Sequence, residues 1–394
     1  MNLAKPKHIR RISTALAVLL ALPLQWGLFS GFYMWFSPFV MLNSFFLLKS
    51  MVVFYVLGWA VLLISFFRKR WFCRYMCPVG LGCDTFSGWG KRNVPKVKKI
   101  PRLGKWLALI SLGGALTGIP LFILLDPMAL FNSFFAAFSS APSVPVIVSL
   151  SGLPLLLLIH LLLPGIWCGK LCPLGGLFDE ISTIRNWTNK TFSKSKDVTT
   201  EKNFGRRMFL ATGSGIVAGL IVPRFLSSKS APFFRPPASI NEKLFNTLCV
   251  RCGNCIKACP GNILTHHQQT KNAISWMTPE LTFQNKGYCL EDCTLCGNVC
   301  PTGSISPFTV EAKKQLYIGS IEIGLEECLL SDRKECDRCK AVCLYEAIKI
   351  IPSDTPLIAK PVADLKKCVG CGACAAVCPT ETIHMVLHGE KSIS

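Results

Sequence analysis

Sixteen of the 21 cysteines in this chain lie in four closely spaced groups between Cys249 and Cys378. The groups that begin at Cys249 and Cys368 have the spacing C-x2-C-x2-C-x3-C-P. Three thiolates at this spacing bind one [4Fe–4S] cluster from a tight turn, and the fourth reaches a neighbouring cluster. Disulfide scaffolds do not need cysteines three residues apart on one turn, and zinc ribbons place two cysteines on each knuckle. The pattern therefore predicts an iron–sulfur electron carrier.

The other two groups vary this spacing. The group at Cys289 has one extra residue between its first two cysteines, and the group at Cys328 has a longer insertion and Leu344 in place of proline. Because both keep C-x2-C-x3-C, we expect four [4Fe–4S] clusters. The predicted ligands are Cys249, Cys252, Cys255, Cys259, Cys289, Cys293, Cys296, Cys300, Cys328, Cys336, Cys339, Cys343, Cys368, Cys371, Cys374 and Cys378.

Each fourth cysteine is expected to serve the cluster of another group. If neighbouring groups pair, Cys300 joins the first group and Cys259 joins the second. In the same way, Cys378 joins the third group and Cys343 joins the fourth. Nested pairing, of the first group with the fourth and the second with the third, is the alternative.

The formal net charge of +21 is concentrated in a few segments. Residues 1–11 carry four Lys or Arg, residues 68–105 carry eleven and residues 165–207 carry eight, whereas 18 basic and 16 acidic residues nearly cancel from residue 229 onward. These basic segments flank apolar runs and would share the cytoplasmic side of a membrane by the positive-inside rule. The charge is thus interpreted as a topology signal, and nucleic-acid binding is not predicted.

The apolar runs predict an inner-membrane protein that crosses the bilayer several times. Four candidate spans cover about residues 12–30, 46–67, 106–125 and 144–164, each near the ~20 residues that cross the hydrocarbon layer. A fifth run at about 208–226 follows Arg206 and Arg207, and paired arginines before Phe-Leu resemble a twin-arginine export signal. We expect this segment to remain as an anchor, with the cysteine-rich part in the periplasm. The alternative is a basic pair at the membrane edge, with that part inside.

The first four spans form a duplicated unit. The segments SPFVMLNSFF at residues 37–46 and DPMALFNSFF at residues 126–135 match, and each copy then has a C-x3-C-P element. Parallel repeats of this kind pack about an axis along the membrane normal. The two elements would then meet on the cytoplasmic face, and four thiolates suffice for a fifth [4Fe–4S] cluster. Its predicted ligands are Cys73, Cys77, Cys168 and Cys172.

Other polar residues in or near the spans are expected to have structural roles. Cys83, opposite Phe178 in the second copy, is interpreted as a free thiol, and Asp84 and Asp179 as helix caps. One histidine, His160, lies in a predicted span, so an internal haem with two histidine ligands is not expected. The Asn-Ser-Phe-Phe segments are interpreted as interfacial anchors, with a quinol pocket as the alternative. The pair His266 and His267 is predicted to lie in an exposed loop.

The predicted fold is a membrane α-helical bundle of duplicated two-helix hairpins plus a fifth anchor helix, followed by an α+β ferredoxin-like polyferredoxin domain. Its predicted parts are a four-span unit at 1–184, a basic cytoplasmic linker at 185–205, a signal or anchor helix at 206–228 and an exported domain at 229–394.

These motifs resemble two known families. The duplicated unit with its C-x3-C-P elements resembles the membrane ferredoxin of periplasmic nitrate reductase systems (NapH type) and its NosR-type relatives. The part from Arg206 onward resembles the exported four-cluster ferredoxin of the same systems (NapG type, also MauM). The chain resembles a fusion of two subunits that are normally separate. It departs from the NapH type because the fourth span leads, through a basic linker, to the export signal and not to a cytoplasmic ferredoxin domain. It departs from the NosR type because no flavin-attachment region is seen before the first span.

The resemblance implies oxidation of quinol from the membrane pool and delivery of electrons to a periplasmic reductase or cytochrome. No substrate-reducing centre is visible in the sequence, so the terminal reaction is expected to belong to a partner. Two alternatives are a NosR-like electron donor for metalloenzyme maturation and a cytoplasmic-facing ferredoxin subunit of an ion-pumping complex. One difficulty is that a cluster at Cys73 and Cys172 would lie across the ~30 Å apolar layer from the exported clusters.

Overall fold

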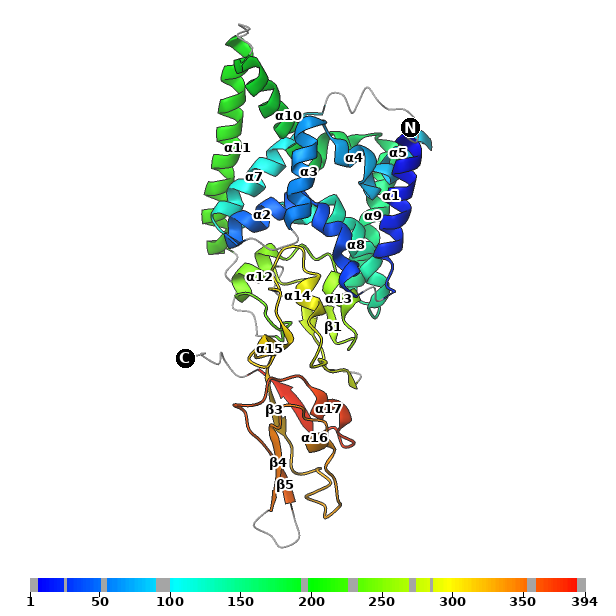
Figure 1. Cartoon of the computed structure of the whole chain (residues 1–394), viewed down its shortest axis with the longest axis vertical. Coiled ribbons are helices and arrows are strands. Elements are labelled where there is room, and N and C mark those ends of the chain that lie inside the picture. Colours follow the sequence, from blue (N-terminus) through cyan, green and yellow to red (C-terminus); the bar gives the residue numbers. More distant parts are fainter. Residues whose placement is uncertain are drawn as a thin grey trace.

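The computed structural model describes residues 6–24, 27–50, 55–89, 100–192, 198–225, 233–268, 274–283, 286–352 and 359–387. The described chain is elongated, with a helical part at one end and a part with short helices and two-stranded sheets at the other (Figure 1). This order confirms the coarse prediction of a helical N-terminal region followed by a ferredoxin region.

The helical part consists of two similar halves followed by one long helix. The first half contains α1 (Pro6–Ala21), η1 (Gly27–Phe36), α2 (Pro38–Leu48), α3 (Tyr55–Phe67), α4 (Trp71–Tyr75) and α5 (Pro78–Trp89). The second half contains α7 (Leu103–Leu116), η2 (Ile123–Leu125), α8 (Pro127–Ala136), η3 (Ala137–Ser139), α9 (Val144–Leu162), the π-helix η4 (Trp167–Leu171) and α10 (Pro173–Phe192). The long helix α11 (Val198–Phe225) follows.

The predicted spans are more broken than hydropathy suggests. Among the described residues, α9 alone is long and apolar enough to cross a membrane by itself, and η1 with α2 forms a second candidate that is bent by 94°. The predicted spans 12–30, 46–67 and 106–125 are each divided between two helices, and residues 25–26 and 51–54 lie outside the described residues. The structure therefore supports one or two spans.

The bend between η1 and α2, and the matching step from η2 to α8, have a local cause. Ser37 and Asp126 are the N-caps, and each precedes a proline at the first helical position, where its fixed φ and missing N–H are tolerated. The Asp126 carboxylate accepts hydrogen bonds from the backbone of Met128 and Ala129 and from Ser37 Oγ at 2.8 Å. The two short helices therefore begin side by side inside the bundle.

The helix α11 packs on α7 through glycines. A Cβ at Gly215 would lie 2.2 Å from the Ile110 carbonyl oxygen, and one at Gly113 would lie 2.3 Å from that of Thr212. Together with Gly219, Gly215 forms the small-xxx-small pattern that lets membrane helices approach closely. Helical structure also covers most of the predicted linker 185–205, whereas residues 193–197 and 226–228 lie outside the described residues.

The ferredoxin part contains three antiparallel two-stranded sheets. These pair β1 (Leu264–His266) with β2 (Pro279–Leu281), β3 (Ser320–Ile323) with β6 (Ile383–Val386), and β4 (Ile348–Pro352) with β5 (Ala359–Ala363). The helices are α12 (Glu242–Leu248), α13 (Asn254–Ala258), α14 (Leu295–Asn298), α15 (Val310–Lys313), α16 (Arg338–Ala341) and α17 (Ala373–Val377).

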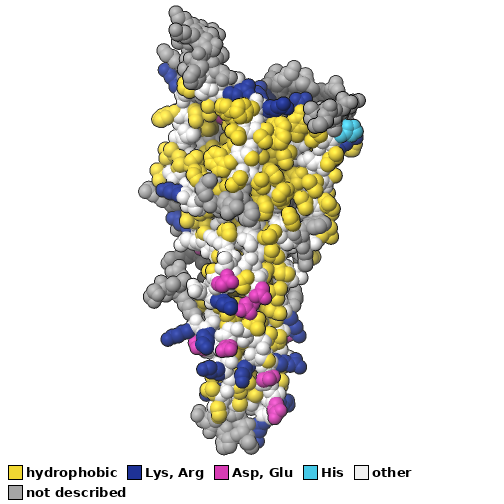
Figure 2. Space-filling model, in the orientation of Figure 1, with side chains coloured by type: hydrophobic (Ala, Val, Ile, Leu, Met, Phe, Trp, Pro, Cys, Tyr) yellow, Lys and Arg dark blue, Asp and Glu magenta, His cyan; other side chains and the backbone are white. Residues whose placement is uncertain are grey.

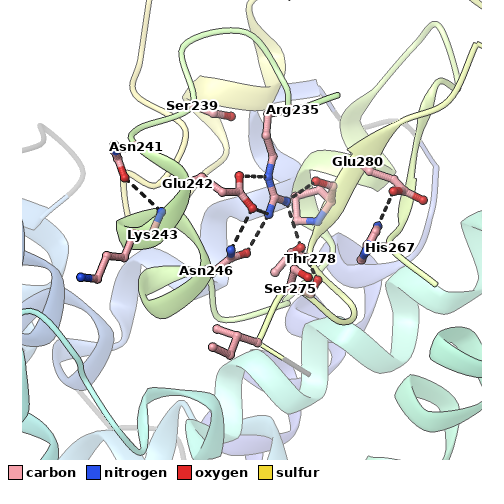
Figure 3. A network of polar contacts seen from close by, with 12 residues as sticks. Arg235, Ser239, Asn241, Glu242, Lys243, Asn246, His267, Ser275, Thr278 and Glu280 are labelled. Atoms are coloured by element: carbon pink, nitrogen blue, oxygen red, sulfur yellow. Dashed lines mark hydrogen bonds and ion pairs between the residues drawn. The ribbon is translucent and has the colours of Figure 1, made fainter. Parts of the chain in front are cut away.

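A network around Arg235 joins α12 to the β1–β2 sheet (Figure 3). The guanidinium group donates to both carboxylate oxygens of Glu242, at 2.8 and 2.7 Å, and to Thr278. The prediction that His266 and His267 are exposed was wrong, because they are 2% and 3% exposed. His267 stacks on the Phe233 ring at 4.1 Å and contacts Glu280 at 2.5 Å.

The first part of the ferredoxin region docks directly on the helical part. Tyr55 Oη donates a hydrogen bond to the Thr302 carbonyl at 3.3 Å, and Lys257 Nζ donates one to the Ala21 carbonyl at 3.1 Å. A Cβ at Gly253 would lie 2.3 Å from Ala136 Cβ, at the end of α8. The two parts pack so closely that Cys252 belongs to the same hydrophobic core as the bundle residues.

The surface changes along the long axis. Hydrophobic side chains cover most of the visible face of the helical part, while Lys and Arg gather at its end away from the ferredoxin region (Figure 2). Exposed apolar residues of this part include Ile12, Leu63, Leu158 and Phe209. On the ferredoxin region, basic and acidic side chains are mixed. An apolar band beside a basic rim is the arrangement expected of helices in a bilayer.

Candidate iron–sulfur sites

The first predicted site is a cavity next to the bundle. It is lined by Cys249, Cys252, Cys255 and Cys300, together with other residues of α12, α13 and β2. Gly253 has φ +71°, in the left-handed region that favours glycine, and α13 begins directly after it. This turn brings the three clustered cysteines to one side, and Cys300 arrives from the next motif.

In the second predicted site, the fourth cysteine of the first motif, Cys259, joins the three clustered cysteines of the second motif. The thiols of Cys289 and Cys296 both lie close enough to Cys259 and to Cys293 to interact electrostatically. Cysteines of both sites share one hydrophobic core, which contains Cys249, Cys296 and Cys300, with Cys259 and Cys289 packed against it. The geometry is the one expected from pairing of neighbouring motifs.

The second half of the ferredoxin region has the same organisation. Cys343 lines a cavity with Cys368, Cys371 and Cys374, and Gly372 at φ +83° takes the role of Gly253. The thiols of Cys328, Cys336 and Cys339 interact with one another, and Cys339 and Cys378 share a hydrophobic core. Cys343 therefore joins the fourth motif as Cys300 joins the first, which is the exchange between neighbouring motifs and not the nested arrangement.

The four sites follow one another along the long axis. The backbone N–H of Cys289 donates to the Cys371 carbonyl at 2.8 Å, and the thiols of these two residues also interact. The second site is therefore next to the site that contains Cys371. The first site contacts the bundle, and the site with Cys339 lies farthest from it, near α16 (Figure 1). The four sites form a row that leads away from the helical part.

Burial and hydroxyl groups affect the thiols differently. Burial raises the pKa of Cys252 and Cys374 to about 12, because a buried thiolate loses its hydration. Metal binding requires thiolates, so loading of these sites would release protons. Burial also opposes ionisation of Cys378, but hydrogen bonds with Thr382 and Thr380 lower its pKa below the ordinary value. Cys300 has the same type of neighbours, Thr302 and Ser304, with hydroxyl oxygens at 3.5 Å.

The four cysteines of the bundle also meet. Cys77 and Cys172 directly precede α5 and α10, and the thiols of Cys73 and Cys168 interact electrostatically with both. The backbone N–H of Gly175 donates to Cys172 Sγ at 3.3 Å. A Cβ at Gly80 or Gly175 would lie 2.9 or 3.1 Å from a cysteine carbonyl oxygen, so the two turns have the same tight geometry.

Two arginines flank this site. Arg70 binds Asp179 through two hydrogen bonds of 2.8 Å and the Cys168 carbonyl at 3.0 Å, whereas Arg10 binds Asp84 at 2.6 Å. The prediction that the two aspartates cap helices was wrong, because both lie inside a helix and pair with arginine. Arg70 places positive charge beside the thiols of Cys73 and Cys172.

This donor set fits an iron–sulfur cluster. Four thiolates are the usual ligands of a [4Fe–4S] cluster, and its net negative charge needs nearby cations and N–H donors. Arg70 interacts electrostatically with Cys73 and Cys172, and the N-termini of α5 and α10 face the thiols. The residues present therefore match the group that the sequence predicts.

Sequence reasoning missed two residues beside this site. The ligand atoms of Cys83, His160 and Cys168 all lie within 4.8 Å of one another. Cys83 was interpreted as a free thiol and His160 only as evidence against haem. Both are 1% exposed or less. A histidine whose repeat counterpart is a serine, Ser65, was the available signal.

The comparisons with known proteins agree with these sites. The family of 4Fe-4S dicluster domains matches residues 248–330 and 332–382, and a family of 4Fe-4S binding domains matches residues 51–96 and 146–193. The methylamine utilization ferredoxin-type protein MauM of Methylophilus methylotrophus is 31% identical over 189 residues, which are 44% of this chain and 79% of MauM. No solved structure matches.

Two further relatives from Escherichia coli (strain K12) are also ferredoxin-type proteins. NapF is 34% identical over 156 residues, which are 39% of this chain and 85% of NapF. NapG is 30% identical over 192 residues, which are 45% of this chain and 82% of NapG. The similarity to MauM, NapF and NapG thus covers slightly less than half of the chain.

Proposed function

Because this chain belongs, over about half its length, to the family of ferredoxin-type 4Fe-4S proteins that includes MauM, NapF and NapG, we propose that it is a membrane-bound electron-transfer protein. It oxidises quinol and passes the electrons to a periplasmic reductase. The helical part is a NapH-like quinol-oxidising unit fused to its own exported ferredoxin. Clusters held by the four cysteine sets of the ferredoxin region, and by Cys73, Cys77, Cys168 and Cys172, supply one-electron transfer.

The contact between the two parts is the observation that carries this proposal. Asp126, at the start of α8, lies close enough to Cys77 to interact electrostatically, and Ala136, at the end of α8, lies against Gly253. A helix of ten residues is about 15 Å long. The bundle cysteines and the first ferredoxin site are thus joined by one short helix and one hydrophobic core, which includes Cys77, Cys172 and Cys252. This spacing is well below the ~30 Å expected from uninterrupted spans.

A cavity beside the bundle cysteines is the candidate quinol site. It has a volume of about 730 Å³ and lies among α7, α10 and α11, within the size range of small-molecule pockets. Its apolar lining includes Trp106, Leu109 and Met208, and its polar lining includes Lys105 and Glu180, which pair at 3.0 Å. A Cβ at the neighbouring Gly104 would lie 2.4 Å from the Cys172 carbonyl oxygen. Gly104, which lies between the cavity residues Arg102 and Lys105, therefore packs against the backbone of a bundle cysteine.

This cavity suits the chemistry of quinol oxidation. Quinol loses two electrons and two protons and becomes quinone, so the site must accept protons as well as electrons. The Glu180 carboxylate offers a hydrogen-bond acceptor for a quinol hydroxyl, and Trp106 and Met208 provide the apolar wall. By contrast, Asn43 and Asn132, in the alternative quinol segments, are buried and donate to backbone carbonyls of their own helices.

The proposed orientation of the protein in the membrane is based on the distribution of its basic residues. Lys and Arg gather at the end of the helical part away from the ferredoxin region (Figure 2), and basic residues favour the cytoplasmic side. The ferredoxin region would then face the periplasm, with α11 as the anchor that follows the paired arginines. Protease treatment of intact right-side-out vesicles tests this topology. The ferredoxin region should be digested from outside, and its protection would contradict export.

Reduction by quinol tests the function. The full-length protein is purified anaerobically, and a short-chain quinol analogue is added while the visible absorption of oxidised clusters is followed. We expect bleaching by quinol. Trp106→Ala should raise the quinol concentration for half-maximal rate about tenfold, because it removes a large part of the apolar wall.

A matched tryptophan provides the control. Trp89 is 78% exposed on α5, away from the cavity, so Trp89→Ala should leave the quinol dependence unchanged. Clusters that are bleached by dithionite but not by quinol would show that the iron–sulfur sites are intact and that the proposed electron donor is wrong.

A further inference from the structure

One corner of the bundle site contains more ligand atoms than a [4Fe–4S] cluster needs. Cys83 on α5 and His160 on α9 approach Cys168 from two sides, and the three ligand atoms lie within 4.8 Å of one another. Cys83 is 1% exposed and His160 is 0% exposed. Two atoms bound to one metal at about 2.0–2.3 Å lie at most about 4.6 Å apart. The three side chains are therefore within small adjustments of a shared metal.

The histidine is held in the form that binds metals. His160 Nδ1 lies 3.1 Å from the Leu156 carbonyl oxygen. Because a carbonyl can only accept, Nδ1 carries the proton and Nε2 of the neutral ring has a free lone pair. Nε2 is buried, makes no hydrogen bond of ordinary geometry among the described residues, and has the Cys168 thiol as its neighbour. Metal-bound histidines commonly donate their other N–H to a backbone carbonyl in this way.

The duplication shows that this corner is not required by the scaffold. From the C-terminal ends of α3 and α9 onward, residues of the two halves correspond at an offset of 95, since these helices end at Phe67 and Leu162 and the left-handed residues Arg70 and Gly165 follow. At the Cys73 corner, the counterparts of His160 and Cys83 are Ser65 and Phe178. Both are buried, and the Phe178 ring packs against Phe72 at 6.3 Å. One corner therefore has one soft donor and the other has three.

We propose that Cys83 and His160 form, with Cys168, a three-donor corner of the bundle's iron site, so that this site keeps its iron when Cys168 alone is removed. The inference rests on the proposed fifth cluster. Thiolate and imidazole both suit iron, and imidazole ligation is known to raise the potential of iron–sulfur centres. The corner at Cys73, which lacks a second donor, has no such reserve.

Iron and sulfide analysis of full-length variants tests this asymmetry. Cys73→Ala should lose about four iron atoms per chain relative to wild type. Cys168→Ala should retain them, with a changed electron paramagnetic resonance spectrum because the ligand of one iron has changed. The triple variant Cys83→Ala/His160→Ala/Cys168→Ala should lose as much iron as Cys73→Ala.

Three outcomes would overturn the proposal. Equal loss of iron in Cys168→Ala and Cys73→Ala would show that Cys83 and His160 are not reserve ligands. Zinc in the wild type that disappears in Cys83→Ala/His160→Ala would instead reveal a separate zinc site. A wild-type iron content that no bundle variant changes would remove the fifth cluster itself, while leaving quinol bleaching of the ferredoxin clusters to decide the proposed function. The double variant Cys83→Ala/His160→Ala, with Cys168 present, should keep its iron and verifies that the bundle still folds.

Discussion

The two halves of the bundle have the same cysteine turns but different surroundings. Both have C-x3-C-P followed by a glycine whose Cβ would press on a cysteine carbonyl, and both place an aspartate one turn later. However, the side chain of Asp179 is 4% exposed and binds Arg70 through two hydrogen bonds, whereas that of Asp84 is 64% exposed and makes one contact with Arg10.

The difference shows which features the duplicated scaffold requires. The turn, its glycine and the proline-started helix recur because they determine where the thiols point. The charge pairs and the donors behind each thiol differ between halves, so they are set by local packing. The second half is also covered on one side by α11, while Ile12 and Leu16 on α1, the counterpart of α7, are 67% and 46% exposed.

The largest expected effect is a difference in the free energy of unfolding between variants of Asp179 and Asp84. Asp179→Ala removes the buried carboxylate that pairs with Arg70 and, at longer distances, with Lys69 and Arg102. Breaking a buried ion pair costs 3–5 kcal/mol, and we expect about 3 kcal/mol because the Arg70 side chain is itself 28% exposed. The measurement is the free energy of unfolding of the purified protein, followed by tryptophan fluorescence.

Asp84→Ala is the matched control for this substitution. An exposed pair contributes at most about 1 kcal/mol and is weakened by salt. Equal losses at the two positions would show that the halves are energetically equivalent despite their different burial, which would contradict the comparison.

Much of the candidate site could be predicted from sequence because ligand spacing is a local property. The four ferredoxin motifs and both C-x3-C-P elements are short patterns, and the structure brings together the members of four of the five predicted sets. In the remaining set, Cys378 shares a hydrophobic core with Cys339. The choice between neighbouring and nested pairing depends instead on how the halves fold, and spacing alone left it open.

The errors concern contacts between distant segments. Hydropathy predicted continuous spans across residues 12–30 and 106–125, whereas the structure divides each between two helices. Only the starts of α2 and α8 had a local signal, the cap-and-proline pairs Ser37-Pro38 and Asp126-Pro127. The burial of His267 depends on Phe233, more than 30 residues earlier, and on Glu280. No local pattern records such contacts.

The second prediction concerns the helix that covers one half only. Gly215→Leu places a side chain where the Ile110 carbonyl oxygen lies 2.2 Å from an added Cβ. Overpacking of this kind costs about 1–3 kcal/mol, and we expect about 2 kcal/mol together with separation of α11 from α7. Cross-linking of cysteine pairs introduced into the two helices measures the separation.

Gly213 provides a control in the same helix. An added Cβ there meets no described atom within 4 Å, so Gly213→Leu should preserve both stability and cross-linking. Loss of cross-linking in both variants would mean that helix backbone flexibility, and not the glycine contact, decides how α11 packs.

The smallest effect concerns the caps at which α2 and α8 begin. Asp126 receives two backbone N–H groups and the Ser37 hydroxyl, whereas Ser37 Oγ receives one N–H, that of Val40, at 3.5 Å. We expect Asp126→Ala to cost about 1 kcal/mol and Ser37→Ala about 0.5 kcal/mol, since caps contribute in this range. Asparagine caps a helix as well as aspartate does, so Asp126→Asn should restore most of the loss. If Asp126→Asn is as destabilising as Asp126→Ala, the carboxylate charge matters more than the cap, and the second half depends on a buried negative charge that Ser37 does not supply to the first.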